Sequence, residues 1–317
     1  MKQLLKLALS NKERVEFDGS SAITTDMASW VYADCPQPAL LGRRVTVDAN
    51  TIKAAFALSP TLTFDGNRVN GLSFEDAWAG GGLPAPDMRD EVFTEPFALD
   101  MGVIKRLAPI VPKADIRQWL NALCFDFTNR TLMATDGYRL YAYAGVLPEN
   151  AGSSQLHVPH AFIYHMLTRK NVTMSFSERS VKIAFAGGRA VGKLIDSEYP
   201  DYQRVIPEIK DRSPISFDRS VLAESVKKLV EIARIQKAKW PSALFDFNAG
   251  TIVYEEIVLP AGILSGRSAR NEAKFGSRYL LDVINAVGCE AIWFFGEEGE
   301  ALLVVDDDFS AVVMPMR

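Results

Sequence analysis

The sequence predicts an α+β fold built from repeated units, each with one helix and several antiparallel strands. Five times along the chain, a short apolar strand is followed by a capping-type residue and then by an amphipathic helix. The spacing is regular, because the predicted strands end at intervals of 52, 59, 59 and 58 residues, at Val47, Leu99, Val158, Phe217 and Phe275. This long period argues against a doubly wound nucleotide-binding fold, in which strands and helices alternate more closely.

Each predicted helix begins directly after its strand. The junction residues suit an N-cap or a first helical turn, and they are Asp48, Asp100, Pro159, Asp218 and Gly276. Apolar residues then recur at helical spacing, first at Ile52, Ile104, Ile163, Leu222 and Leu280, and next at Phe56, Leu107, Leu167, Val226 and Ile284. Between helices, stretches such as 172–176 and 181–185 alternate like half-buried antiparallel strands.

Pairs of units are expected to form domains, because a single unit leaves one face of its sheet uncovered. The predicted domains are residues 1–94, 95–212 and 213–317, with the charged, proline-bearing segment 207–214 as a linker.

The first domain is irregular. One period back from Val47, a further unit would fall before Met1, so residues 1–38 supply only strand-like segments at 4–9, 14–17, 23–25 and 30–32. We therefore expect the first domain to be shortened by one strand and one helix, with a flexible glycine-rich loop at 79–86.

Composition describes an ordinary globular protein, with 48% hydrophobic and 23% charged residues. No apolar run approaches the roughly 18 residues of a membrane helix, and the N-terminus does not fit a signal peptide. Cys35, Cys124 and Cys289 are widely spaced in largely apolar contexts, so we expect buried free thiols in a reducing cytoplasm.

The net charge of −4 bears on nucleic-acid binding. A protein that holds DNA through phosphate contacts is usually strongly basic. An acidic chain that works on DNA must localise its positive charge or hold DNA by other means, and enclosure is such a means.

Residues 133–144 contain the most informative local pattern. Asp136-Gly137 lies between an apolar run and an alternating aromatic run, which predicts a tight hairpin because glycine adopts positive φ without a steric penalty. The bend would present polar, aromatic, cationic and aliphatic side chains from one short segment, a surface that can hold a peptide. A plain strand turn is the alternative that the local pattern leaves open.

Three segments resemble the signature segments of the bacterial beta sliding clamp family, the processivity rings of DNA polymerase III. They are Ala-Thr-Asp-Gly-Tyr-Arg-Leu at 134–140, Glu-Tyr-Pro-Asp-Tyr-Gln-Arg-Val-Ile-Pro at 198–207 and Val-Val-Met-Pro-Met-Arg at 312–317, in the family's order. The resemblance is strong from about residue 97 onward and weak before it.

This resemblance implies a DNA-clamp fold of three domains and six units, of which this chain has a shortened first domain. It further implies a processivity factor without enzymatic activity or cofactor, which forms a head-to-tail homodimer around double-stranded DNA. DNA polymerase and the clamp loader are the implied partners.

The family carries a pocket that receives a short hydrophobic motif from these partners. The matching positions here are Leu120, Thr135, Gly137, Tyr138, Arg139, Leu140, Pro200, Arg204, Val205, Val312, Val313, Met314, Pro315, Met316 and Arg317. Prolines would form rigid walls, methionines an adaptable apolar surface, and Arg139 and Arg204 could anchor carboxylates or carbonyls at the rim. Tyr138 stands where most members have histidine, and an edge strand at 312–314 is the plainer alternative.

Basic residues on the predicted helices are the implied DNA-facing set. They are Lys53, Lys105, Arg106, Arg169, Lys170, Arg219, Lys227 and Lys228, with Arg234, Lys237 and Lys239 beyond them. If the helices face one channel, these side chains would attract phosphates, whereas scattered basic residues otherwise indicate a solvated helix face.

Two other functions are alternatives to the clamp. A clamp-like decoy or regulator would keep the peptide pocket without closing around DNA, and the shortened first domain favours it. A metal-dependent hydrolase using Asp306 and Asp308 has little support, because Asp306 to Asp308 fits a hairpin turn. His157, His160 and His165 do not have the spacing of ligands that share a helical face, so no metal site is expected.

Overall fold

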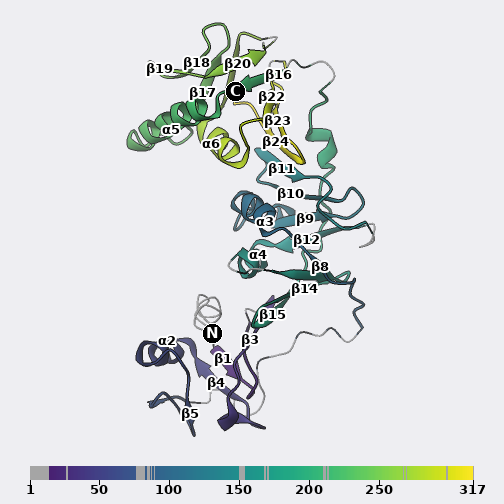
Figure 1. Ribbon diagram of the computed structural model, residues 1–317, viewed down its shortest axis with the longest axis vertical. Helices are drawn as coiled ribbons and strands as arrows, with labels where there is room; N and C mark the ends of the chain where they lie inside the picture. The colour runs from purple at the N-terminus through teal and green to yellow at the C-terminus, as the bar shows by residue number, and fades with distance from the viewer. Residues whose placement is uncertain are drawn as a thin grey trace. The chain divides into compact units, whose positions relative to one another are not determined.

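The structure is a computed structural model that divides into two compact units, described separately here (Figure 1). Unit 1 comprises residues 1–104 and 156–196, and unit 2 comprises residues 105–155 and 197–317. The residues described are 14–25, 28–75, 83, 86, 88, 90–149, 154–167, 169, 171–209, 212, 214–266, 268, 270–297 and 299–316. The predicted strand at 4–9 and most of the predicted loop at 79–86 lie outside them. The division into three domains stays a prediction.

All five strand-then-helix junctions predicted from the repeat are present. The strands are β4 (Val45–Asp48), β8 (Phe97–Ala98), β12 (Gln155–Pro159), β16 (Pro214–Phe217) and β21 (Glu272–Gly276). The helices that follow are α2 (Ala49–Leu58), α3 (Met101–Leu107), α4 (His160–Leu167), α5 (Arg219–Ile235) and α6 (Ser277–Ala286). The first predicted apolar position of every helix is fully buried, as amphipathic packing requires.

Two aspartates show why the helices start where they do. The Asp48 carboxylate accepts hydrogen bonds from the backbone N–H groups of Asn50 and Thr51 at the start of α2. Asp218 does the same for Ser220 and Val221 at the start of α5. These bonds satisfy N–H groups that have no partner inside the helix, which fixes each start.

Unit 1 contains one long antiparallel sheet in the order β4-β1-β2-β3-β15-β14-β13-β8. The further strands are β1 (Arg14–Phe17), β2 (Ser21–Thr25), β3 (Ser29–Asp34), β13 (Thr173–Phe176), β14 (Ser180–Phe185) and β15 (Gly188–Lys193). The predicted strands at 14–17, 23–25 and 30–32 are thus confirmed. A separate small sheet follows α2, with strands β5 (Phe64–Asp65), β6 (Arg68–Val69) and β7 (Leu72–Ser73).

Unit 2 contains two antiparallel sheets. The first runs β9 (Ala122–Asp126), β10 (Thr131–Thr135), β11 (Arg139–Tyr143), β24 (Phe309–Val313), β23 (Leu302–Asp306), β22 (Ile292–Phe294), β16 and β20 (Ile263–Gly266). The second runs β19 (Ile257–Pro260), β18 (Thr251–Tyr254), β17 (Ser242–Asp246) and β21. Helices α5 and α6 pack against each other, with α5 on β18 and β19 and α6 on β17, β21 and β24. Short 3₁₀ helices at Pro38–Leu40, Ala108–Ile110, Gln118–Asn121 and Tyr202–Val205 complete the elements.

The pairing of β11 with β24 brings the predicted hairpin to the last strand of the chain. It runs from Arg139 opposite Val313 to Tyr143 opposite Phe309. Because β24 also pairs with β23, it is an interior strand of the sheet. The alternative of an edge strand at 312–314 is therefore wrong.

The predictions for the three cysteines and for the turn at Asp306 to Asp308 have different outcomes. Cys35 and Cys124 are buried as predicted, but Cys289 is exposed, because it lies in the turn between α6 and β22 instead of continuing the apolar helix. Asp306 to Asp308 form the predicted turn between β23 and β24, where Asp307 has a φ of 50°. The Asp306 carboxylate accepts a hydrogen bond of 2.7 Å from the Gly288 N–H, a structural role.

No helix within the described ranges is long and apolar enough to cross a membrane. The part of the chain that the structure describes also holds no group of three or more metal-ligating side chains. His165 lies on α4 with its Nε2 3.4 Å from the Ser29 hydroxyl, in a buried packing position.

Candidate peptide-binding site

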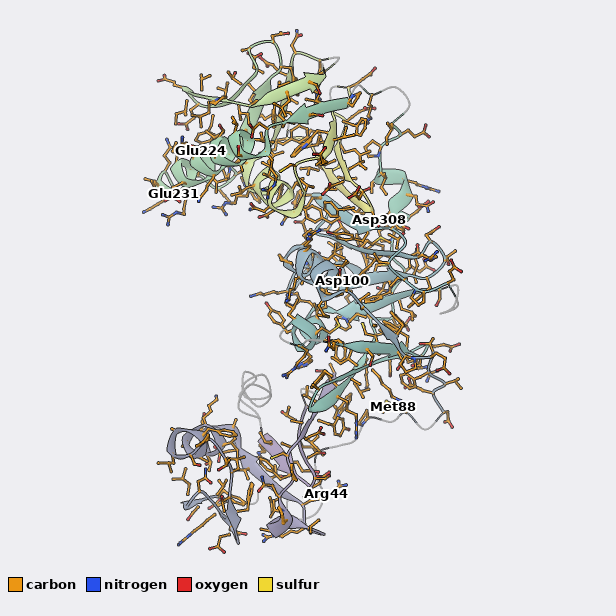
Figure 2. The ribbon with its side chains drawn as sticks, viewed as in Figure 1. Arg44, Met88, Asp100, Glu224, Glu231 and Asp308 are labelled. Carbon is orange, nitrogen blue, oxygen red and sulfur yellow. The ribbon has the colours of Figure 1, made fainter. Side chains whose placement is uncertain are left out.

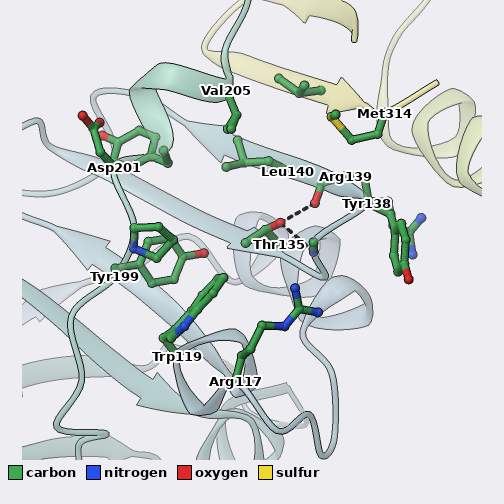
Figure 3. Close-up of a pocket in the computed structure, with 14 residues that line it drawn as sticks. Arg117, Trp119, Thr135, Tyr138, Arg139, Leu140, Tyr199, Asp201, Val205 and Met314 are labelled. Carbon is green, nitrogen blue, oxygen red and sulfur yellow. Dashed lines mark hydrogen bonds between the residues drawn. The ribbon is translucent and has the colours of Figure 1, made fainter. Parts of the chain in front are cut away.

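An apolar cavity of about 220 Å³ opens beside the hairpin between β10 and β11 in unit 2 (Figure 3). Nine predicted pocket residues line it: Thr135, Gly137, Tyr138, Arg139, Leu140, Pro200, Val205, Val312 and Met314. The floor rests on a buried cluster that includes Leu140, Tyr199, Tyr202 and Val312. We call this site the Leu140 cavity.

The hairpin is held by hydrogen bonds that its own sequence provides. The Asp136 Oδ1 accepts from the N–H groups of Tyr138 at 2.9 Å and Arg139 at 3.0 Å, while the Thr135 hydroxyl donates to the Arg139 carbonyl at 2.6 Å. Gly137 has a φ of 87°, and a Cβ there would lie 3.0 Å from an Arg117 nitrogen. The positive φ favours glycine, whereas the contact with the flexible end of the Arg117 side chain could be relieved by a small movement of that side chain.

Arg139 is fixed by two carboxylates and is only 9% exposed. Its Nε donates to Asp136 at 3.0 Å and its Nη1 donates to Asp282 of α6 at 2.5 Å, while its guanidinium lies 4.8 Å from the centre of the Tyr279 ring. Burial alone would lower the pKa of Arg139, but these carboxylates hold the pKa above its usual value. Arg139 therefore joins the hairpin to α6 and is not an open anchor at the rim, contrary to the expectation from sequence. Arg204 is likewise paired, with Asp201 at 2.9 Å.

Five further residues line the Leu140 cavity that were not predicted as pocket residues, although three of them lie in the signature segment 198–207. They are Arg117, Trp119, Tyr199, Asp201 and Tyr202. The Trp119 and Tyr199 rings meet edge to face with centroids 5.7 Å apart, and the Arg117 guanidinium lies 5.7 Å from the Trp119 ring centre. Trp119, Tyr199 and Tyr202 form an aromatic wall of the cavity (Figure 3).

A buried carboxylate holds the Tyr202 part of this wall. The Tyr202 hydroxyl donates to Asp126 Oδ2 at 3.0 Å, and Asp126 also accepts from Asn129 and Gln155. Burial alone would raise the pKa of Asp126, but these hydrogen bonds outweigh it and hold the pKa below its usual value. Burial and the neighbouring carboxylate raise the pKa of Tyr202 to about 12. The pair thus anchors the segment 199–205 to β9.

Tyr202→Phe should loosen this wall. We expect the free energy of unfolding to fall by about 1–2 kcal/mol at pH 7, because the Asp126 carboxylate loses a donor. Since the pKa of Tyr202 is raised on folding, its contribution is full below about pH 10 and is lost as the pH rises through about 12. Urea unfolding at several pH values should show the difference between variant and parent shrinking over that range. Tyr254→Phe in β18 is the control, and an equal loss there at pH 7 would contradict the anchoring role.

A second cavity, of about 430 Å³, lies beside the first and shares Tyr138 and Met314 with it. We call it the Trp240 cavity, and its other apolar walls are Trp240, Pro241, Tyr279, Pro315 and Met316. Tyr138 stacks on Tyr279 with ring centroids 6.0 Å apart. Met314 and Met316 are held in place through backbone bonds from their N–H groups to the carbonyls of Tyr138 and Lys274, each of 2.9 Å.

The remaining predicted pocket residues lie elsewhere. Leu120 and Val313 are fully buried and line neither cavity, whereas Arg204 is exposed near Asp201. Arg317 lies outside the described residues. The structure therefore brings the three signature segments together but places two of the predicted apolar pocket residues, Leu120 and Val313, in the core.

The predicted DNA-facing residues divide into three groups. Lys53, Lys105, Arg106, Lys227 and Lys228 are exposed on their helices. Arg219 donates to the Ile284 carbonyl at 3.0 Å, and Arg169 packs over the Phe185 ring at 4.6 Å, so both are partly committed to the protein. Arg106, although exposed, also donates to the Tyr143 hydroxyl at 2.8 Å. Lys170 lies outside the described residues. Glu224 and Glu231 also project from α5 (Figure 2) and pair with Lys228 and Arg234.

The known proteins that this chain resembles in sequence are DNA polymerase III beta subunits, also named beta sliding clamps. Residues 101–201 match the family of DNA polymerase III beta subunit central domains. The chain is 24% identical to the beta sliding clamp of Proteus mirabilis over 284 residues, which cover 81% of this chain and 76% of that protein. It is 26% identical to that of Pseudomonas aeruginosa over 233 residues, covering 68% of this chain and 62% of that protein.

Solved structures extend the likeness along the whole chain. The DNA polymerase sliding clamp of Bacillus subtilis superposes with a TM-score of 0.78 at 15% identity, covering 100% of this chain and 97% of that one. The Caulobacter crescentus pol III beta structure gives a TM-score of 0.76 at 23% identity, covering 99% and 97%. The chain is thus related to the bacterial beta sliding clamps and has their fold.

Proposed function

We propose that this protein is a DNA polymerase processivity factor, a sliding clamp that encircles duplex DNA and recruits polymerase and clamp loader through the Leu140 cavity. The observation that carries the proposal is the convergence of three distant segments, 134–140, 198–207 and 312–316, on one apolar cavity. Relatives over most of the chain are named beta sliding clamps, which supports the same role. In this role the protein acts in the bacterial cytoplasm without catalysis of its own.

The cavity suits a short apolar peptide from a partner. Its lining is mainly aliphatic and aromatic, while its two cations, Arg117 and Arg139, are already paired with Asp115, Asp136 and Asp282. Affinity would then come from burying apolar side chains, as in other small-molecule and peptide sites. A peptide with adjacent leucine and phenylalanine residues should bind at about micromolar strength, roughly −8 kcal/mol.

Enclosure of DNA fits the charge of the chain. At a net charge of −4, the protein is a poor candidate for tight phosphate binding, and α5 carries glutamates among its basic residues. The exposed lysines and arginines on the helices would give only weak, salt-sensitive attraction to DNA. Retention on DNA would therefore come from closure of the ring.

A surface on unit 2 offers a joint for closing the ring. Ile235 at the end of α5 is 70% exposed and Val258 on the edge strand β19 is 59% exposed. The Gln236 side chain donates to Glu255 at 3.0 Å, which holds the end of α5 near the turn before β19. An open strand edge beside exposed apolar side chains is suited to a second chain. We propose that residues 45–74 of the neighbouring subunit, the retained part of its first domain, meet this surface head to tail.

The mass of the native particle tests this proposal against its alternative. A sliding clamp of this design should be a dimer of about 70 kDa at micromolar concentration, twice the 35.0 kDa chain. Sedimentation velocity measures this directly. A monomer that still binds the apolar peptide would favour the decoy or regulator that keeps the pocket without enclosing DNA.

A further inference from the structure

The face of the unit 1 sheet that turns away from α4 carries a cavity of about 370 Å³. The cavity lies at β3 and β15, a strand pair that joins two repeat units, as β11 and β24 do in unit 2. Gly192 of β15 points to α4, because a Cβ there would lie 2.4 Å from the Phe162 ring. Arg189 and Val191, which line the cavity, are of opposite parity to Gly192 and therefore point away from α4. We call this site the Arg189 cavity.

The strand register places two cations beside each other on this face. On β15, Arg189 pairs with Ala184 of β14. Two positions along β15, Val191 pairs with Lys182. Lys182 and Arg189 are therefore diagonal cross-strand neighbours on one face, with their Cα atoms about 7–8 Å apart. Both line the cavity.

These two cations are held in place but are not neutralised. The Lys182 Nζ lies 3.3 Å from the centre of the Phe93 ring, and the Arg189 guanidinium lies 4.4 Å from the centre of the Tyr32 ring. Neither cation forms an ion pair within the described residues, and none of the residues that line the cavity is acidic. Because the aromatic contacts already restrict both side chains, an anion that pairs with them costs less conformational entropy.

A carboxylate of the chain itself already binds beside the cavity on the same face. Glu91, in the segment before β8, accepts hydrogen bonds from the hydroxyls of Ser177 and Ser180, the latter at 3.0 Å. Ser180 lies two positions from Lys182 on β14, so both side chains share this face. The backbone N–H of Thr94, in the same segment, donates to a carbonyl of β13 at 2.7 Å. An acidic segment can therefore lie on this sheet face.

We propose that the Arg189 cavity binds an extended acidic peptide of a partner protein, with two carboxylates two positions apart. Alternate side chains of an extended peptide lie on one side and about 7 Å apart, which matches the spacing of Lys182 and Arg189. Each carboxylate pairs with one cation. The hydroxyls of Thr173 and Ser175 lie in the same cross-strand rows and can donate to the peptide backbone. The proposed function does not depend on this second peptide.

Three synthetic peptides test the spacing by fluorescence anisotropy. The first contains Glu-Thr-Glu, the second contains Glu-Glu-Thr with the same charge, and the third contains Gln-Thr-Gln, all within identical neutral flanks. We expect the first to bind at least about tenfold more tightly than either of the others, the scale of one charge-assisted hydrogen bond. This advantage should shrink as salt is raised. Equal binding of the first two peptides would mean attraction without geometry and would overturn the inference.

Variants of the two cations identify the residues responsible. Arg189→Glu and Lys182→Glu should each remove the advantage of the Glu-Thr-Glu peptide. Arg189→Glu should also bind a peptide with one glutamate replaced by lysine more tightly than the parent does, which separates charge reversal from loss of the fold. Lys53→Glu on α2 is the matched charge control, because Lys53 is exposed in the same unit but does not line the cavity. An advantage that survives both cavity variants, or that Lys53→Glu also removes, contradicts the assignment.

Two competitors distinguish this site from others. A saturating amount of the short apolar peptide should leave binding of the acidic peptide unchanged, because the Leu140 cavity lies in unit 2. Displacement would place the acidic peptide in the Leu140 cavity and overturn the inference. A single-stranded thymidine oligonucleotide that displaces the peptide at a lower concentration than unlabelled peptide does would identify a nucleic-acid site instead. Failure of the apolar peptide to bind bears on the proposed function alone.

Discussion

Met314→Asp is expected to weaken binding of the short apolar peptide at least about 100-fold, or about 2.7 kcal/mol, while leaving the fold intact. Met314 lines both the Leu140 and the Trp240 cavities and is 43% exposed, so an aspartate there stays solvated in the free protein. Its backbone N–H, which bonds to the Tyr138 carbonyl, is kept. Binding the peptide would bury the new carboxylate against apolar groups, which is strongly unfavourable.

Titration calorimetry with the short peptide measures this loss, and thermal unfolding checks the fold. Leu264→Asp is the control, because Leu264 is also an exposed apolar residue of unit 2 but lines neither cavity. Leu140 is less suitable for a charged substitution, since it belongs to the buried cluster beneath the cavity. Undiminished peptide binding by Met314→Asp would show that the cavity is not the recruiting site.

Ile235→Asp should have the largest effect on the ring. The substitution places a charge in the proposed joint, where an apolar side chain would otherwise be desolvated against the neighbouring subunit. We expect the dissociation constant of the dimer to rise at least about 100-fold, so that sedimentation at micromolar concentration detects monomers. Val258→Asp on β19 should act in the same direction.

The two variants should separate the two properties of the protein. Met314→Asp should lose peptide binding and keep the dimer mass, whereas Ile235→Asp should keep peptide binding and lose the dimer. If Ile235→Asp keeps the parent mass, the joint lies elsewhere on the surface. If either variant loses both properties together, the pocket and the joint are not independent.

The sequence predicts the repeated elements well because their signals are local. Asp48 and Asp218 cap the helices that follow them, and the helical period places Ile52, Leu222 and their equivalents in the core. The hairpin at Asp136-Gly137 follows from backbone conformation at one glycine. Neither kind of signal depends on distant parts of the chain.

The parts that escaped prediction depend on tertiary packing. Arg139 is neutralised by Asp282, 143 residues further along, so its availability could not be judged from the hairpin alone. Trp119 lies in a short 3₁₀ helix without a periodic pattern, and only packing against Tyr199 brings it to the cavity wall. Leu120 matched the family's pocket by position, yet the fold buries it completely.

Retention on circular DNA tests the central claim, that this protein holds DNA by enclosing it. Protein placed on a nicked circular duplex by its clamp loader is separated from free protein by gel filtration, before and after the circle is cut once. The account predicts that the parent stays on the circle and is lost from the linear product, while Ile235→Asp is retained on neither. Equal retention of the parent on circular and linear DNA would mean that it grips DNA through contacts, and would contradict the account.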